Sequence, residues 1–542
     1  MGFINKKAFS KMSKSTWIFM AILVIGIFLR TYSFSEWLRF NSDQARDAEI
    51  IREMVISGAV PLLGPVAGGT QFKLGPVFYY FQYVSAEIFG AFPDKMAYPD
   101  LIFGIAAIPL FYFLARQFFK KNISLMLMAL YAVTFFTIQY SRFAWNPNSA
   151  QFFDMIFIYS ILRIWREQAN KKTIWLILAG VSLGISMQLH TLLLFGMPFA
   201  SLILAIYLFK NKRINALDIA LIVFIALMLN GTQIISELRT GGANYLEFKN
   251  ALVDKSDDQN PLWKNALFIA SCQAQSNVKI LVPYTGQEDC DFPLADKYLK
   301  RLERRNADFA DWFFYVVKIV TVIIFSGGSL FLLYRKIKKD ILRKKKFIIL
   351  ILFNLALLSV FVPFGAEISL RYFIVLAFTP FILLGLWLEF LLEQGILWMR
   401  NLALIVEIVL VVCNLFFSWK TFQDYSRNIP GNMADGTAKQ MERITSYLIE
   451  EAGNVDKIQI SGQKIYLGRF FNRVSYFANN KGIEIIPVDE NTLVDKKLPM
   501  FYIINEMSKK CEIGVANKYG TVDSCKKIYD VAILKIDMEI SK

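Results

Sequence analysis

Three charged residues follow the first apolar run of the chain: Asp43, Arg46 and Asp47, in the stretch SDQARD. Apolar residues then recur at helical spacing through 48–55, which predicts an amphipathic helix that begins near Asp43. A carboxylate at a helix N-terminus is oriented by backbone N–H groups and kept ionised by the helix dipole, as a general base requires. Asp43 is therefore the candidate catalytic base, and Arg46 and Asp47 are candidate substrate-binding residues. The simpler alternative is that Asp43 or Ser42 only caps the helix.

Three cations stand beside aromatic residues, or beside Gly and Pro, at the ends of other apolar runs. Lys73 lies in QFKLGP, Arg142 in YSRFAWNPN and Arg371 in SLRYF. Each alone is typical of a side chain whose charged end reaches back to a membrane interface. Together with an oriented carboxylate, they describe a site for a lipid-linked phosphate and a proton acceptor. The turn after Arg142 adds Asn146 and Asn148 as substrate-binding candidates.

The chain has a single histidine, His190, near the outer end of a predicted helix. We expect it to be a hydrogen-bonded packing residue and not a ligand or a base. No histidine cluster with metal-ligand spacing stands in the predicted external segments, and the turn after Arg142 offers Asn146 and Asn148 where a metal site would need acids, so we expect neither a metal nor another cofactor. Asp154 and Glu407 are ionisable groups at membrane depth, and such groups are functional candidates even without an evident partner.

Composition places the chain among polytopic membrane proteins. Of its 542 residues, 55% are hydrophobic and 19% are charged, and the mean hydropathy is +0.41. The net charge of +16 comes mainly from Lys and Arg in short loops between apolar runs, so it indicates positive-inside topology and not nucleic-acid binding. We predict about eleven transmembrane helices. They cover residues 16–34, 98–118, 123–140, 149–165, 173–189, 191–209, 214–235, 311–334, 347–364, 372–393 and 402–419.

The basic loops set the orientation. RQFFKKN, RIWREQANKK, KNKR and YRKIKKDILRKKK fall on the cytoplasmic side together with the N-terminus. Residues 35–97 and 236–310 are then external loops of a transmembrane domain, 1–419, and residues 420–542 form an extracytoplasmic domain. The apolar run 75–90 is short and opens on Gly-Pro, so we expect an interfacial or re-entrant helix there.

The predicted external domain has an α/β pattern. A helix near 436–453 precedes the strand-type runs KIQISG, IEIIPV, MFYIIN and VAILKID, with a helical stretch between the first two runs. Cys511 and Cys525 lie in this domain, and Cys272 and Cys290 lie in one predicted external loop. The sequence does not decide whether these cysteines form two local disulfides or are all reduced.

The motifs resemble the integral-membrane glycosyltransferases of the GT-C fold, in the bacterial branch similar to dolichyl-phosphate-mannose protein mannosyltransferases and to the aminoarabinose lipid A transferase. The resemblance implies that Asp43 is the catalytic base or an acceptor-orienting carboxylate. It also implies that Lys73 and the pair Arg371 and Tyr372 contact the donor phosphate. The mannosyltransferases carry an Asp-Glu pair where this chain has Asp43 and Gln44, which leaves the role of the second carboxylate empty. The motifs that carry the resemblance, within about residues 16–400, are DQARD, IREMVISGAVPLLGP, KLGPVFYYF, YSRFAWNPN and SLRYF.

The expected function is therefore inverting transfer of a hexosyl or pentosyl group from a polyprenyl-phosphate donor to a hydroxyl acceptor at the outer face of the cytoplasmic membrane. The acceptor hydroxyl belongs to a protein, a lipid or a cell-wall glycan. Lys73, Arg142 and Arg371 would hold the donor phosphate, with its lipid between the helices, while Asp43 takes the proton. The alternative is a transporter or flippase of lipid-linked sugar, which needs the cations but not Asp43 and usually shows paired halves with broken helices. A membrane anchor that only displays the external domain would not need so many spans.

Overall fold

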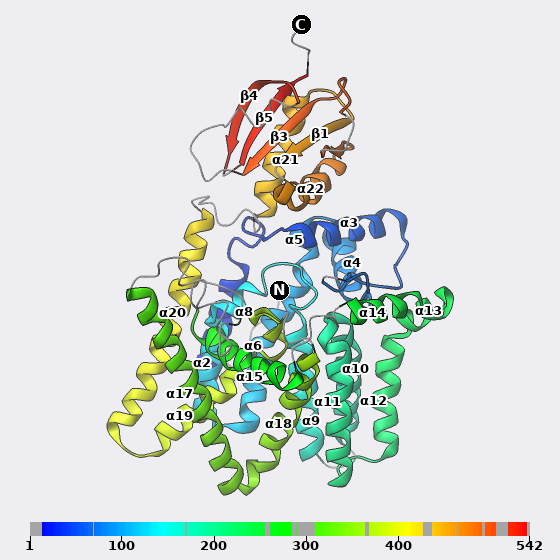
Figure 1. Ribbon diagram of the computed structural model, residues 1–542. Coiled ribbons are helices and arrows are strands. Elements are labelled where there is room, and N and C mark those ends of the chain that lie inside the picture. The colour runs from blue at the N-terminus through cyan, green and yellow to red at the C-terminus, as the bar shows by residue number, and fades with distance from the viewer. Residues whose placement is uncertain are drawn as a thin grey trace, which may run out of the picture.

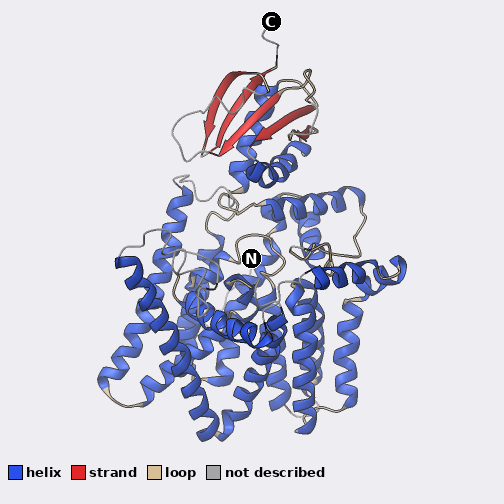
Figure 2. Ribbon diagram, viewed as in Figure 1, coloured by secondary structure: helices blue, strands red, loops and turns tan. Residues whose placement is uncertain are grey.

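The structure is a computed structural model, and it consists of a bundle of long helices with a small sheet domain at one end (Figure 1). Helices dominate, and the strands are confined to that domain (Figure 2). This is the predicted fold class, a polytopic α-helical protein with a C-terminal α/β domain. The described residues are 13–68, 70–167, 171–254, 261–283, 290, 309–363, 368–426, 436–462, 464–489, 494–505, 519–529 and 531–538.

Helices occupy every segment that was predicted to span the membrane. Among the described helices, five are long and apolar enough to cross, or seven if each of two bent pairs is one span. The count of eleven therefore stays a prediction. The helices are α2 (Lys14–Thr31), α6 (Tyr98–Phe118), α7 (Lys121–Val133), α8 (Phe135–Gln139), α9 (Ala150–Arg166), α10 (Thr173–Leu189), α11 (Thr191–Lys210), α12 (Ala216–Leu229), α13 (Gly231–Thr240), α17 (Phe309–Lys339), α18 (Ile341–Phe361), η4 (Leu370–Leu376), α19 (Thr379–Glu393) and α20 (Leu397–Ser426).

The segment predicted as one helix over 372–393 is bent. It divides into the 3-10 helix η4 and the α-helix α19, which meet at 71°. Pro380 stands in the first turn of α19, where its missing N–H and its ring prevent the preceding turn from continuing as the same α-helix. Arg371, which precedes the predicted span by one residue, therefore lies in a 3-10 helix and not at the head of an α-helix.

A layer of short helices covers the bundle end that faces the sheet domain (Figure 1). It contains α3 (Ser42–Ser57), α4 (Val77–Phe89) and α5 (Pro93–Met96). The 13 residues of α4 rise only about 20 Å, whereas a membrane core is about 30 Å thick. The short apolar run 75–90 thus forms a helix that does not reach across a bilayer.

Helix α3 begins at a different cap from the one that we expected. The side-chain oxygen of Asn41 accepts hydrogen bonds from the backbone N–H groups of Asp43 at 2.9 Å and Gln44 at 3.3 Å. The alternative in which Asp43 or Ser42 is the N-cap is therefore wrong. Because Asn41 provides the cap, the carboxylate of Asp43 is left free for another contact.

The C-terminal domain is a five-stranded mixed sheet in the order β2-β1-β3-β5-β4. The first three of these strands run parallel, and β5 is antiparallel to both β3 and β4. The sequence indicated four of the strands and missed β4, whose residues are largely polar. The elements are α21 (Ala438–Ala452), β1 (Lys457–Gly462), α22 (Lys464–Asn479), β2 (Glu484–Pro487), β3 (Met500–Asn505), β4 (Thr521–Ile528) and β5 (Val531–Asp537).

The C-terminal domain is joined to the segment that leads into α3. The backbone N–H of Ala438 donates to the carbonyl of Leu38 at 2.9 Å, and the N–H of Phe40 donates to the carbonyl of Gly436 at 3.0 Å. The ring of Phe40 also packs on Tyr476 of α22, with centroids 5.6 Å apart. These contacts end only three residues before Asp43, so the domain helps to place that carboxylate.

The other predicted external loop begins with α13 and α14 (Ala243–Asp254) and continues into α15 (Leu262–Leu281). Cys272 of α15 forms a disulfide with Cys290, across a Cα–Cα distance of 5.3 Å. This is one of the two pairings that the sequence left open. The second involves Cys511, which lies outside the described residues, as does part of the 236–310 loop.

The opposite end of the bundle holds a buried charge cluster. The carboxylate of Glu389 is fully buried and forms ion pairs with Lys336 at 2.7 Å and with Arg343 at 2.6 Å. Lys336 is in the last turn of α17 and Arg343 is in the first turn of α18, and they flank the turn that lies at the end away from the sheet domain (Figure 1). The arrangement places that turn on the side opposite to α3 and the C-terminal domain.

Accessibility labelling tests the orientation. With Cys413 replaced by Ser, a cysteine at Asn480 should react with a membrane-impermeant thiol reagent in intact cells, and a cysteine at Lys344 should react only after lysis. Both positions are exposed, so the difference reports the side of the membrane and not burial. Labelling of the Lys344 position and not of the Asn480 position would invert the orientation.

Candidate active site

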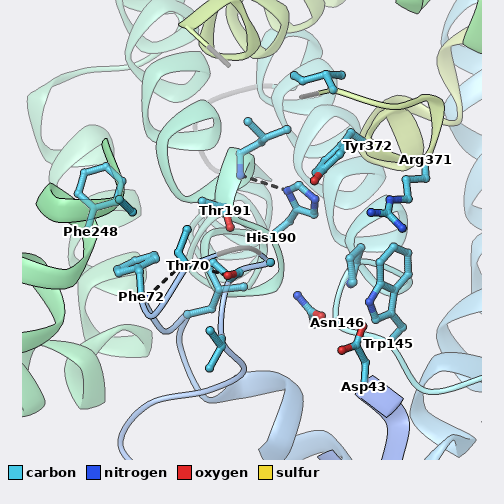
Figure 3. A pocket seen from close by; sticks show the side chains of 18 of the residues that line it. Asp43, Thr70, Phe72, Trp145, Asn146, His190, Thr191, Phe248, Arg371 and Tyr372 are labelled. Atoms are coloured by element: carbon cyan, nitrogen blue, oxygen red, sulfur yellow. Dashed lines mark hydrogen bonds between the residues drawn. The ribbon is translucent and has the colours of Figure 1, made fainter. Parts of the chain in front are cut away.

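A cavity of about 230 Å³ lies where six separate segments meet (Figure 3). They are α3, the 66–74 loop, the turn after α8, the α10–α11 junction, α14 and η4. These segments are distant in sequence and are brought together at the bundle end that faces the sheet domain. The lining residues are Asp43, Arg46, Val66, Ala67, Gly68, Thr70, Phe72, Leu74, Trp145, Asn146, Pro147, His190, Thr191, Leu192, Phe248, Ala251, Ile368, Arg371 and Tyr372.

The cavity joins a carboxylate and a guanidinium from different elements. In Figure 3, Asp43 lies beside Trp145 and Asn146, and the Trp145 ring stands between Asp43 and Arg371. Tyr372 follows Arg371 on the same wall. A negative proton acceptor and a positive charge thus face one space without being paired to each other, which is the arrangement a group-transfer site needs.

A buried network holds the N-terminal turn of α3. Asp47, which is only 2% exposed, accepts hydrogen bonds from the phenol of Tyr79 at 3.0 Å and from Arg46 Nε at 2.9 Å. The guanidinium of Arg46 also reaches Asp43 at 3.4 Å. Burial raises the pKa of Asp47 from its ordinary value of 3.8 to about 6, although Arg46 and Tyr79 oppose that shift. Arg46 is therefore fixed on one side by a buried carboxylate and guides Asp43 on the other.

Gln44 stands where the mannosyltransferases have a second carboxylate, but it does not line the cavity. Its side-chain oxygen accepts the backbone N–H of Asn41 at 3.2 Å, which completes a capping box with the Asn41 side chain. Glu and Gln both serve at this position of a capping box. The departure from the family pattern therefore preserves the start of the helix.

The turn after α8 places Asn146 and Trp145 in the cavity. The amide of Asn146 donates to the carbonyl of Leu189 at 2.7 Å, which ties this turn to the end of α10. Asp100, which the sequence analysis did not single out, accepts the backbone N–H of Trp145 at 3.3 Å. Asn148 donates inside its own turn to Phe143 at 2.7 Å and does not line the cavity.

Two of the three predicted phosphate-binding cations do not line the cavity. The backbone of Lys73 is bonded to the Asn244 side chain through its N–H, at 2.7 Å, and its carbonyl, at 3.0 Å. The chain is extended there, so the side chains of Phe72 and Leu74 point inward and that of Lys73 is exposed. Phosphate binding by Lys73 consequently has no support in this arrangement.

Arg142 turns away from the cavity toward the C-terminal end of α2. Arg142 is 7% exposed, and its guanidinium donates to the carbonyls of Arg30 and Tyr32, each at 2.8 Å. Cations at helix C-termini satisfy carbonyl groups that have no partner within the helix. Arg142 therefore connects the turn after α8 to α2.

His190 is a buried, hydrogen-bonded packing residue, as expected, and it also lines the cavity. It is both the C-cap of α10 and the N-cap of α11, and its Nδ1 accepts the backbone N–H of Leu192 at 3.1 Å. Its ring meets the ring of Tyr372 edge-on, with centroids 5.5 Å apart. The only sequence signal was a polar residue between two apolar runs, in QLHTLLL.

The remaining ionisable candidates lie elsewhere. Asp154 of α9 is buried and accepts a hydrogen bond from Ser186 at 2.7 Å, and Glu407 is buried in α20. Neither lines the cavity. In the part of the chain that the structure describes, no three His, Cys, Asp or Glu residues gather as they would around a metal ion. Metal independence stays a prediction.

Comparisons with known proteins agree with this architecture. Residues 73–233 match the family model described as dolichyl-phosphate-mannose-protein mannosyltransferase. ArnT from Cupriavidus metallidurans in the apo state is 10% identical with a TM-score of 0.56, over 96% of this chain and 97% of that chain. The apo oligosaccharyltransferase from Archaeoglobus fulgidus is 15% identical with a TM-score of 0.50, over 89% of this chain and 65% of that chain.

A further similar structure is AglB from Archaeoglobus fulgidus in complex with an inhibitory peptide and a dolichol-phosphate. It is 14% identical with a TM-score of 0.50, over 85% of this chain and 63% of that chain. The search of curated proteins found no sequence match. The chain thus has the GT-C fold of integral-membrane glycosyltransferases. Its resemblance to mannosyltransferases and to the aminoarabinose transferase is confirmed.

The Asp47 network predicts a pH dependence of activity. Protonation of Asp47 below about pH 6 releases Arg46, so turnover should fall as the pH drops through this value. Stability should not fall with it, because a carboxyl whose folded pKa is raised contributes stability below about pH 4, and this contribution is lost as the pH rises through about 6. Asp47→Asn should lack this acid limb, and an unchanged acid limb in that variant would contradict the role of Asp47.

Proposed function

We propose that this protein is an inverting glycosyltransferase that moves a sugar from a polyprenyl-phosphate donor to a hydroxyl acceptor at the outer face of the cytoplasmic membrane. The observation that carries the proposal is one cavity lined by both Asp43 and Arg371, at the bundle end away from the basic turns. The GT-C fold supports the same class. The complex of AglB with a dolichol-phosphate supports a lipid-linked donor here.

In this proposal, Arg371 and Tyr372 bind the donor phosphate. A second cavity of about 180 Å³ also has Arg371 in its wall, together with Phe135, Phe136 and Lys279. A phosphate at Arg371 would place the sugar in the cavity with Asp43 and the first isoprene units in the aromatic second cavity. Lys279 would add a cation there, a role that the sequence analysis did not assign to it.

Asp43 takes the proton of the acceptor hydroxyl. The hydroxyl oxygen attacks the anomeric carbon from the face opposite to the phosphate, the bond from that carbon to the phosphate oxygen breaks, and polyprenyl phosphate leaves as an anion. Arg371 stabilises the charge that develops on the leaving phosphate, which lowers the barrier because that charge is larger in the transition state than in the bound donor. Attack from the opposite face inverts the configuration at the anomeric carbon.

The transporter alternative has one observation in its favour. Two helix pairs are bent, α12 with α13 by 59° and η4 with α19 by 71°, and broken helices are common in transporters. A transporter still gives no reason for a carboxylate at the start of α3 inside the cavity. The two functions differ in whether the lipid-linked sugar is consumed or only moved.

Replacing Asp43 by Asn tests the catalytic role. The Asn41 cap does not involve the Asp43 carboxylate, whose side-chain contact within α3 is the exposed pair with Arg46 at 3.4 Å, so folding and donor binding should survive. Turnover should fall by about 10²- to 10⁴-fold, the usual contribution of general acid–base catalysis. Release of polyprenyl phosphate in detergent, with donor and acceptor supplied, is the measurement. Wild-type turnover by Asp43→Asn would contradict the catalytic role of Asp43 and favour the transporter alternative.

Arg371→Ala should raise the donor KM by about 10- to 100-fold, because a charge-assisted hydrogen bond to phosphate contributes about 1.5–3 kcal/mol. Lys73→Ala is the matched control, since that side chain is exposed and outside the cavity, and its donor KM should stay at the wild-type value. Initial rates at varied donor concentration separate the two. A donor KM that rises in Lys73→Ala and not in Arg371→Ala would instead assign phosphate binding to Lys73, as the sequence resemblance implied.

A further inference from the structure

His190 has one ring nitrogen in use and one that is not. Nδ1 accepts the backbone N–H of Leu192, so Nδ1 carries no proton and the neutral ring must carry its proton on Nε2. Among the residues that the structure describes, none forms a hydrogen bond with Nε2. The capping contact thus fixes the tautomer and leaves an N–H donor that has no partner among the described residues.

The ring is held beside the proposed phosphate site. His190 is 8% exposed, yet it lines the cavity together with Arg371 and Tyr372 (Figure 3). Burial, assisted by the charge of Arg371, lowers the pKa of His190 to about 4. The imidazole is therefore neutral at physiological pH and donates through one atom only.

We propose that His190 is a substrate-binding residue whose Nε2–H donates a hydrogen bond to a phosphate oxygen of the lipid-linked donor, beside Arg371. This inference rests on the proposed function, because it names a second group on the same phosphate. The phosphate is preferred over a sugar hydroxyl because His190 adjoins Arg371 and Tyr372, whereas Asp43 and Asn146 face the part of the cavity assigned to the sugar.

A neutral donor suits this position for a physical reason. The leaving phosphate gains negative charge during transfer, and a fixed N–H strengthens its hydrogen bond as that charge grows. A ring with this low pKa stays neutral, and the N–H of a neutral imidazole is too weak an acid to give its proton to phosphate, so polyprenyl phosphate leaves as the anion and the acceptor's proton stays on Asp43. His190 thus assists departure without taking part in the proton transfer.

Two substitutions separate this role from helix capping. His190→Asn keeps an oxygen at the place of Nδ1 and so keeps the N-cap, but it has no donor at the place of Nε2. His190→Gln loses the cap and can place an N–H where Nε2 was. If His190 binds phosphate, the Asn variant should unfold at the wild-type temperature and bind sugar-free polyprenyl phosphate about ten- to a hundredfold more weakly. The Gln variant should unfold at a lower temperature but bind the same probe more tightly than the Asn variant.

Binding of polyprenyl phosphate to the purified full-length protein in detergent is the measurement, with thermal unfolding of each variant beside it. Wild-type affinity in His190→Asn would overturn the proposal and leave His190 as a cap. A higher KM for the sugar donor with unchanged affinity for polyprenyl phosphate would overturn the phosphate assignment in favour of a sugar hydroxyl. If the wild type binds polyprenyl phosphate and His190→Asn does not, yet neither transfers sugar, the inference stands while the proposed function fails.

Discussion

The ion pair between the buried carboxylate of Asp47 and the partly exposed Arg46 is the contact on which the candidate site depends. A buried carboxylate is costly unless its charge is compensated, and here Arg46 and the phenol of Tyr79 offset part of that cost. Tyr79 belongs to α4, so the same contact fixes α3 on α4. Because Arg46 also reaches Asp43, the placement of the candidate base follows from the burial of its neighbour.

The C-terminal domain constrains α3 from the other side. The backbone bonds of Leu38 and Phe40 to residues 436 and 438 hold the chain just before the Asn41 cap. Further along α3, Glu49 accepts a hydrogen bond from Asn479 of α22 at 3.1 Å. The helix that carries Asp43 is thus held between two parts of the chain that are nearly 400 residues apart. A change in the position of the C-terminal domain would therefore also move the carboxylate of Asp43.

Hydropathy predicted the helices well, because an apolar run of sufficient length has few alternatives to a helix in a bilayer. The same pattern brought Asp43, Arg46, Asn146 and Arg371 to one depth, since they all follow or precede apolar runs on one side. The hydropathy pattern could not predict which way each side chain points. The inward direction of Phe72, and so the outward direction of Lys73, depends on an extended pairing of Val66 with Lys73.

Arg142 and His190 show the same limit in another form. Each sits at a helix end, and its role depends on which backbone groups are left unpaired nearby. For Arg142 these are carbonyls of α2, more than 100 residues away, so that no local pattern revealed them. For His190 the group is the N–H of Leu192, and the capping bond decides which ring nitrogen faces the cavity.

The central claim is that a lipid-linked sugar is consumed in the cavity between α3 and η4. The most direct measurement is mass spectrometry of a native-host lipid extract incubated with the purified protein. Our account predicts that one polyprenyl-phosphate sugar disappears, that polyprenyl phosphate appears in equal amount, and that the sugar mass is added to an acceptor. An unchanged lipid pool, together with movement of the same lipid across the bilayer of reconstituted vesicles, would contradict the account and identify a transporter.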